Sequence, residues 1–217
     1  KYNDYIILMA YDEHENASAP GAVGAQKWVE AAVDKLLNDV PAEKVILAIA
    51  AYGYDWKLKS KDLAANFTYQ EAIKNARKYE SIVEFDNDTY NLRYRYYNED
   101  DDSLHEVHFT DAVTNFNMLR FATESNLAGV SLWRLGGEDK RLWSFYDMPM
   151  TKEALQRFDF SVFNQLEAGD KPSYSGEGEI LDIIATPKPG KLHTELDNDA
   201  MLISEEYYDA LPSTYEI

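Results

Sequence analysis

Three short apolar runs, each followed by aromatic or charged residues, constrain the fold of this chain more than any other feature. The runs are residues 6–10, 45–51 and 128–132. The residues that follow them are Tyr11 and Asp12, then Tyr52 and Tyr54, then Trp133. Apolar runs of this length, bounded by turn residues, are typical of strands buried on both faces, as in a parallel sheet. The pattern predicts parallel strands over about 6–12, 45–51 and 129–135, with the polar and aromatic residues gathered at their carboxyl ends.

The segment between the first two predicted strands completes a βαβ unit. Apolar residues recur every three or four positions over residues 25–38, which predicts an amphipathic helix. The crossover is expected to be right-handed. The preceding loop, residues 13–24, should lie at the face where α/β barrels place their chemistry. His14 in this loop is either a ligand contact or a solvated side chain.

Residues 57–110 interrupt this alternation and predict a small α+β insertion. A helix is expected over 68–79, with Thr68 as N-cap and Glu71 completing a capping box. Short strands are expected over residues 82–85, 91–97 and 104–109, the last two joined as a hairpin. The acidic turn at 99–103 lacks the glycine and the distal glutamate of an EF-hand, so we interpret it as a solvated hairpin tip rather than a metal site.

The rest of the chain divides at about residue 165. A helix over 111–125, with Asp111 as N-cap, leads into the last predicted strand. Closing helices are expected over 138–145 and 151–164. Proline, glycine and serine then cluster, which predicts a linker and the start of an extended segment over 166–217. We therefore expect two units, residues 1–165 and 166–217.

Length bears on how complete the first unit is. The chain has 217 residues, whereas a complete (β/α)8 barrel typically needs about 250. The first predicted strand starts almost at residue 1, so the chain is expected to be the C-terminal part of a barrel, about strands 6–8. The alternative is a complete small α/β domain whose first strand lies at the terminus.

Three motifs, in this order, carry a resemblance to a known family. They are Met-Ala-Tyr-Asp at 9–12, Tyr-Gly-Tyr-Asp-Trp at 52–56 and Ser-Leu-Trp-Arg-Leu-Gly at 131–136. Together they resemble the sixth, seventh and eighth barrel strands of glycoside hydrolase family 18, the chitinase-like family. The second motif and residues 105–112 look most like the spore-cortex-lytic glucosaminidase branch. Residues 176–217 resemble the connector that precedes polysaccharide deacetylase modules in multidomain bacterial proteins.

The resemblance implies substrate-assisted retaining hydrolysis of β-1,4-linked N-acetylglucosamine polymers, an exception to the scheme with two carboxylates. In the family, the acetamido oxygen of the sugar attacks the anomeric carbon, and one glutamate is the general acid. That glutamate closes an Asp-x-x-Asp-x-Asp-x-Glu motif, which does not occur here. The acid is therefore expected upstream of this chain, and the chain alone is expected to be inactive.

The resemblance also assigns roles to residues of this chain. Tyr11 would hold the acetamido carbonyl, and Asp12 would lie near the same group as the second catalytic residue. Trp133 would form the floor under the distorted sugar, with Met9 packed around it. The further substrate-binding residues would be Tyr52 and Tyr54 flanking the cleft, and Glu106 and Asp111 at its rim. Family chitinases commonly carry arginine where Tyr54 stands, so the resemblance favours short or peptidoglycan-type glycans over long-chain chitin.

Composition excludes several classes of function. The net charge is −18, from 39 acidic and 21 basic residues, which argues against nucleic acid and anionic membrane surfaces as partners. The chain has no cysteine, so thiolate metal sites and cysteine nucleophiles are excluded. No metal or cofactor is expected. The expected partners are an N-acetylated polysaccharide or oligosaccharide and neighbouring domains of the same polypeptide, and family resemblance places the protein outside the cytoplasm.

Two other hypotheses stay open beside a glycosidase. The barrel could have lost its acid and kept the sugar cleft as a lectin module. It could also be a scaffold that positions an adjacent polysaccharide deacetylase domain. The residue at the end of the upstream fourth strand separates the first two, because glutamate supports an enzyme and glutamine or leucine supports a lectin.

Overall fold

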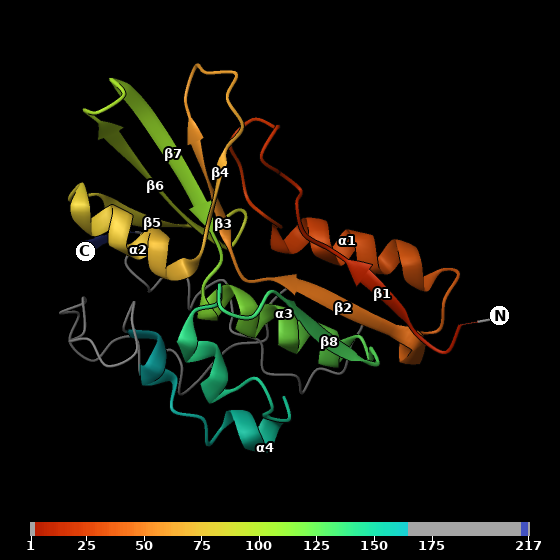
Figure 1. Cartoon of the computed structure of the whole chain (residues 1–217). Coiled ribbons are helices and arrows are strands. Elements are labelled where there is room, and N and C mark those ends of the chain that lie inside the picture. The colour runs from red at the N-terminus through yellow and green to blue at the C-terminus, as the bar shows by residue number, and fades with distance from the viewer. Residues whose placement is uncertain (1–2, 165–213, 217) are drawn as a thin grey trace.

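The structure, a computed structural model, describes residues 3–164 and 214–216. Its first sheet contains three parallel strands in the order β1-β2-β8. Leu8 pairs with Leu47, and Leu47 with Val130. The strands are β1 (Ile6–Met9), β2 (Val45–Ala50) and β8 (Gly129–Trp133). The prediction of three parallel strands is confirmed, and their carboxyl ends meet at one edge of the sheet (Figure 1).

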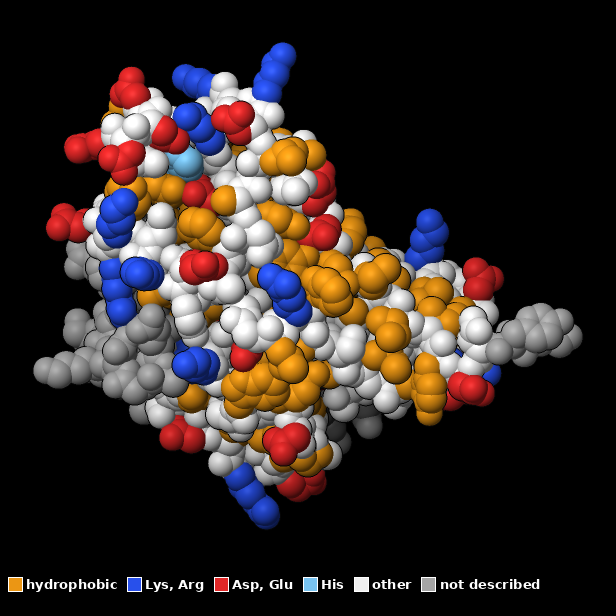
Figure 2. Space-filling model, in the orientation of Figure 1, with side chains coloured by type: hydrophobic (Ala, Val, Ile, Leu, Met, Phe, Trp, Pro, Cys, Tyr) orange, Lys and Arg blue, Asp and Glu red, His pale blue; other side chains and the backbone are white. Residues whose placement is uncertain are grey.

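The two faces of this sheet differ. On one face, Leu47 and Ile49 join the core with Val29 and Val33 of α1 (Gln26–Leu37) and with residues of α3 (Ala112–Glu124). On the other face, Ile7 and Met9 are 57% and 67% exposed. The helices therefore cover only one side of the sheet, as the outer ring of helices does in an α/β barrel. Apolar side chains gather over the β1–β2 region in Figure 2.

A second, antiparallel sheet rises from the end of β2 (Figure 1). Its strand order is β4-β3-β7-β6-β5-β9. The strands are β3 (Gly53–Lys57), β4 (Ala65–Phe67), β5 (Ile82–Asp86), β6 (Asn91–Asn98), β7 (Ser103–Phe109) and β9 (Thr214–Glu216). The expected hairpin is β6–β7, and β4 was not predicted. The insertion begins at Gly53 rather than residue 57, because the Tyr-Gly-Tyr-Asp-Trp segment turns out of the barrel sheet and pairs with β7.

Helix α2 (Tyr69–Lys78) follows β4 and packs on the insertion sheet. Thr68 caps it as predicted, with its side chain accepting from the Glu71 backbone and Glu71 accepting from the Thr68 backbone. Tyr69, Ala72, Ile73 and Ala76 are buried on its inner face. Asp111 likewise caps α3, by accepting from the Thr114 backbone at 2.9 Å.

The closing segment differs from the two helices predicted for it. The chain forms η2 (Lys140–Ser144), α4 (Lys152–Leu155) and η3 (Phe160–Asn164), joined by bends, and one further 3-10 turn, η1 (Ala42–Lys44), precedes β2. Phe145 and Phe163 meet the Phe116 ring at 5.1 and 5.4 Å between centroids. Packing several phenylalanines around one ring of α3 overrides the local helical preference of this segment.

The predicted linker and the segment that resembles a deacetylase connector lie almost wholly outside the described residues. Of residues 166–217, only Thr214–Glu216 are described, as β9 antiparallel to β5. Within the described ranges, no helix has both the length and the apolar character that a membrane span requires.

Candidate functional site

The site is built at the carboxyl end of β1. The strand ends at Met9, three residues before the predicted end, and Asp12 takes a left-handed backbone conformation with φ 61°. This turn directs the chain into the loop, which Glu13 fastens by accepting a 2.8 Å hydrogen bond from the Ala25 backbone at the start of α1. Tyr11 and Asp12 are thus held at the edge where the parallel strands end.

Asp12 binds the two tyrosines of the second motif. One oxygen of its carboxylate, Oδ1, accepts hydrogen bonds from the Tyr54 hydroxyl at 2.9 Å and from the Tyr52 hydroxyl. Tyr52 and Tyr54 flank Gly53, where the chain passes from the parallel to the antiparallel sheet. The predicted gathering of these residues from separate motifs is therefore seen in the structure.

The two tyrosines are not open substrate contacts, however. They are only 6% and 8% exposed, and their hydroxyls donate to Asp12. Burial, and then the bond to Asp12, raises the pKa of Tyr52 above its ordinary value and that of Tyr54 to about 12. Both phenols therefore stay protonated near neutral pH and act as donors that hold Asp12 in place.

Tyr11 and Trp133 form the open part of the site. Their rings stack at 6.3 Å between centroids and 16° between planes. Trp133 is 54% exposed and is held near β2 by the 2.8 Å bond from the Ala51 backbone to its carbonyl. The Tyr11 hydroxyl has no hydrogen bond among the described residues, so it can donate to a ligand. Burial, and then the neighbouring Asp12, raises the pKa of Tyr11, which keeps that hydroxyl protonated.

Met9 lies on the same open face of the sheet as Trp133. It pairs in register with Ala48, and Ala50, two residues on, pairs with Trp133. Residues two apart on a strand share a face. Met9 thus shares a sheet face with the predicted floor, with β2 between them, and is itself 67% exposed, so its packing role stays a prediction.

The loop after Asp12 is fastened internally. His14 hydrogen-bonds the Ala19 carbonyl at 3.0 Å, and its ring fills the space beside Gly21, where an added Cβ would lie 2.5 Å from it. Trp56 donates to the Ser18 carbonyl at 3.1 Å. His14 therefore shapes the loop, and Trp56, which the sequence analysis did not assign to the site, ties the loop to the insertion.

Glu106 lies on β7 of the insertion sheet, opposite Trp56 of β3. Its carboxylate accepts from Arg95 and His108, each at 2.8 Å, and these bonds lower the pKa of Glu106 to about 2. Glu106 links β6 to β7 with most of its side chain buried, and its place at the cleft rim stays a prediction.

Asp111, the other residue predicted at the rim, lies at the start of α3. It is 3% exposed and caps α3, and its carboxylate lies 3.6 Å from the guanidinium of Arg141. Helix capping and burial occupy this carboxylate, and its role as a substrate contact at the cleft rim stays a prediction. Asp139 completes the buried cluster by accepting from Arg141 and from the Ala112 backbone. Asp139 and Arg141 bond each other, but their further partners Ala112, Asp111 and Tyr69 are distant in the chain, so no local pattern marks this cluster in the sequence.

A second buried polar group, also missed from the sequence, joins the strands of the insertion. Asp55 accepts from Tyr96 at 2.6 Å and contacts His105 Nδ1 at 2.9 Å. His105 also contacts Asp101 at 3.2 Å, and Asp101 in turn pairs with Lys57. These residues lie on the sheet face opposite to Trp56 and hold the insertion together. Among the described residues, no group of histidine, aspartate and glutamate side chains is arranged to hold a metal ion.

Comparison with known proteins gives a consistent result. The model of the glycosyl hydrolases family 18 matches residues 1–139. The chain is 28% identical over 143 residues to the uncharacterized glycosylase YvbX of Bacillus subtilis (strain 168), covering 66% of this chain and 41% of that protein. It is 30% identical over 146 residues to the cortical fragment-lytic enzyme of the same organism, covering 64% and 33%.

Solved structures agree on the fold. The chitinase from Chromobacterium violaceum ATCC 12472 superposes with a TM-score of 0.61 at 31% identity, over 65% of this chain and 44% of that one. The predicted fold class is confirmed, since β1, β2, β8 and their helices form part of a chitinase-type barrel that carries an α+β insertion. The chain spans less than half the length of these two curated relatives.

Proposed function

Because the chain belongs to the glycosyl hydrolases of family 18, we propose that it is the C-terminal part of a glycosidase that cleaves β-1,4-linked N-acetylglucosamine polysaccharides. The observation that supports this most is the free Tyr11 hydroxyl beside the exposed Trp133 ring, next to an Asp12 that two buried tyrosines hold. A flat apolar ring beside directed donors is the pairing that a pyranose with an acetamido group requires.

The proposed reaction is substrate-assisted and retains the anomeric configuration. The acetamido oxygen of the bound sugar attacks the anomeric carbon, the glycosidic bond breaks, and a proton passes to the leaving oxygen from a general acid. Water then opens the oxazolinium-like intermediate and restores the N-acetyl sugar. We place the general acid, a glutamate, upstream of Lys1.

In this scheme the residues of the chain position the nucleophile. Tyr11 donates to the acetamido oxygen, and this hydrogen bond holds the group for attack on the anomeric carbon. Asp12, fixed through Oδ1 by Tyr52 and Tyr54, leaves its other oxygen for the acetamido N–H. Trp133 supports the distorted ring from below. Tyr52 and Tyr54 are positioning residues, since their hydroxyls are directed at Asp12.

The glycan and the compartment follow from the same proposal. The curated relative named a cortical fragment-lytic enzyme and the related chitinase structure both point to polymers that contain N-acetylglucosamine. Such polymers lie outside the cytoplasm, so we place the action of the protein there, in the cell envelope or beyond.

The test uses the complete protein, with the residues upstream of Lys1, and N-acetylated oligosaccharides as substrate. Tyr11→Phe should lower kcat by about 10²-fold, the usual cost of losing one donor aimed at the reacting oxygen, and should change KM little. Tyr5→Phe is the matched control, because Tyr5 lies before β1 and is 61% exposed.

Each outcome separates the hypotheses. Loss of turnover in Tyr11→Phe alone supports the enzyme. Equal turnover in the two variants would show that Tyr11 does not hold the acetamido group. Binding of the sugar by a complete protein that releases none would replace the enzyme with a lectin.

A further inference from the structure

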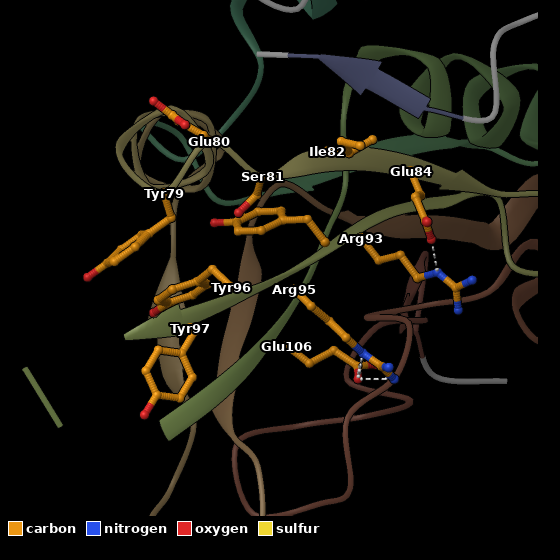
Figure 3. Close-up of a pocket in the computed structure, with 11 residues that line it drawn as sticks. Tyr79, Glu80, Ser81, Ile82, Glu84, Arg93, Arg95, Tyr96, Tyr97 and Glu106 are labelled. Carbon is orange, nitrogen blue, oxygen red and sulfur yellow. Dashed lines mark hydrogen bonds and ion pairs between the residues drawn. The ribbon is translucent and has the colours of Figure 1, made fainter. Parts of the chain in front are cut away.

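Ion pairs of two kinds, exposed and buried, occur in this chain. Exposed pairs line a cavity of about 530 Å³ in the insertion, where β5 and β6 part. Figure 3 shows Arg93 with Glu84 and Arg95 with Glu106 at this cavity, and the two arginine side chains are 44% and 64% exposed. Pairs in contact with water hold their surroundings only weakly, because solvent screens the charges. A pair withdrawn from water is a stronger constraint on the fold around it.

Such a buried pair, Asp139 with Arg141, lies in the loop that follows β8. The two residues are 1% and 2% exposed. One oxygen of Asp139, Oδ2, accepts from Arg141 Nε at 2.9 Å and from its Nη2, and also from the Ala112 backbone at the start of α3 at 3.0 Å. The same guanidinium donates to the Tyr69 hydroxyl at the start of α2 and to the Phe163 carbonyl in η3, each at 3.3 Å. The pair therefore joins η2 to three other elements.

A buried pair of this kind sets geometry more than it adds stability. Taking two charges out of water costs about as much free energy as their attraction returns, so apolar residues of the same volume often stabilise a fold equally well. A guanidinium that bonds one carboxylate through two N–H groups nevertheless fixes the relative orientation of the two side chains. We conclude that the Asp139–Arg141 pair determines how the start of η2 sits against α2 and α3.

The loop that this pair holds begins at Trp133. The Trp133 carbonyl accepts from the Ala51 backbone at 2.8 Å, just beyond the end of the β2–β8 pairing. Further on, Gly137 lies against the Ala51 carbonyl, since a Cβ at Gly137 would be 2.5 Å from that oxygen, and the Gly137 carbonyl accepts from the Tyr69 backbone at 2.9 Å. Tyr69 thus bonds Gly137 through its backbone and Arg141 through its hydroxyl. The loop is fastened at both ends, and the second fastening depends on the buried pair.

Trp133 needs this support because it is the last residue of β8. Its ring is 54% exposed and stacks on Tyr11, so the indole is not enclosed by the core. Strand ends open readily when few buried contacts hold the residues beyond them. The plane of the Trp133 ring therefore depends on the loop that continues from it.

We propose that Asp139 and Arg141 are positioning residues for the glycosidase, which fix the loop after β8 and, through it, the plane of the Trp133 ring. Their role in the reaction rests on the proposed function, in which Trp133 supports the distorted sugar. A displacement of about 1 Å in a group that orients the substrate can lower the rate by about 10²-fold. Loosening the pair should therefore slow turnover, although both residues are buried away from the sugar.

The experiment is fluorine NMR of the complete protein, with the residues upstream of Lys1, labelled with 5-fluorotryptophan and measured without sugar. The Trp133 resonance is the one that Trp133→Phe removes. Arg141→Lys keeps the charge and loses the double hydrogen bond to the carboxylate. Arg120→Lys is the matched control, because Arg120 is also 2% exposed and pairs with Glu124 inside α3.

Both arginine substitutions should lower the melting temperature, since each disturbs a buried pair. Only Arg141→Lys should shift or broaden the Trp133 resonance. Only this variant should also lower kcat per folded molecule on N-acetylated oligosaccharides by about tenfold or more, with little change in KM. If Arg141→Lys does not fold, Tyr69→Phe takes its place under the same criteria, because it removes one partner of the guanidinium.

The outcomes separate this proposal from the proposed function. An unchanged Trp133 resonance in Arg141→Lys overturns the proposal, and so does an equal change in Arg120→Lys. A changed resonance with full kcat also overturns it, because the ring then moves without effect on the reaction. Failure of the proposed function shows elsewhere, as undiminished turnover in Tyr11→Phe, while the resonance measured without sugar still reports on the loop.

A complete protein that binds the sugar and cleaves none would also count against the proposed function. The dissociation constant of the sugar then replaces kcat. Binding weakened about tenfold in Arg141→Lys alone would support the positioning of Trp133 by the buried pair. Equal binding in Arg141→Lys and Arg120→Lys would overturn it.

Discussion

At the scale of single residues, Asp12 joins the two sheets of this chain. Asp12 follows β1 of the parallel sheet. Its carboxylate accepts hydrogen bonds from the hydroxyl of Tyr52, which precedes β3 of the antiparallel sheet, and from that of Tyr54, which lies within β3. Hydrogen bonds to a charged group contribute about 1.5–3 kcal/mol each. Two such bonds on one oxygen fix the carboxylate relative to Tyr11, and the site depends on the insertion for its geometry.

This arrangement predicts how stability changes in alkaline solution. The folded pKa of Tyr54 is about 12 against 10.0 for the free side chain. A raised folded pKa gives stability that is full below pH 10 and is lost as the pH rises toward 12, because the unfolded chain releases the proton first. Tyr54→Phe should therefore make the free energy of unfolding fall less steeply as the pH rises through this range. Urea unfolding at several pH values in the range measures the change. Tyr5→Phe should leave the decline unchanged, and an equal effect of both substitutions would contradict the assignment.

At the scale of elements, β3 carries the connection between the barrel sheet and the insertion. Gly53 begins this strand and pairs with Phe109 of β7. A Cβ at Gly53 would lie 2.4 Å from the His108 carbonyl oxygen and 2.4 Å from the Phe109 Cβ. Only glycine allows the two backbones to approach so closely, and this approach sets where Tyr52 and Tyr54 stand.

Gly53→Ala should therefore lower the free energy of unfolding by about 1–3 kcal/mol, the usual cost of an overpacked position. The same substitution should weaken sugar binding at the Tyr11 site, because β3 must shift. Gly129→Ala in β8 is the control, since a Cβ there meets nothing within 4 Å. Urea unfolding measures both variants, and equal stability would show that the β3–β7 contact tolerates a side chain.

At the scale of the whole molecule, the barrel sheet is open on the side that faces the site. Ile7, Met9 and Trp133 are more than half exposed there, and β1 and β8 are edge strands among the described residues. Free edges beside exposed apolar side chains promote association between molecules. The isolated chain should therefore self-associate with rising concentration, as light scattering would detect.

The isolated chain should also release no sugar from chitooligosaccharides between acidic and neutral pH. A proton donor to the leaving oxygen is worth about 10²–10⁴-fold in rate, and the carboxylates near the site have other roles. Asp12 accepts hydrogen bonds from the Tyr52 and Tyr54 hydroxyls, and Glu13 accepts one from the Ala25 backbone. Assaying released sugar tests this directly, and turnover by the purified chain would place the acid within these 217 residues.

Periodicity in the sequence by itself determined the parallel strands and the helices α1, α2 and α3. The order of the motifs determined which residues gather at one sheet edge, namely Tyr11, Asp12, Tyr52, Tyr54 and Trp133. These features depend on local patterns and on the rule that parallel strands share an end. Only the tertiary structure decided that Tyr52 and Tyr54 are buried donors to Asp12, that Asp111 is a buried helix cap, and that β5 and β6 part to form a cavity. Each of these depends on residues far apart in the chain, whose burial and hydrogen bonding no local pattern records.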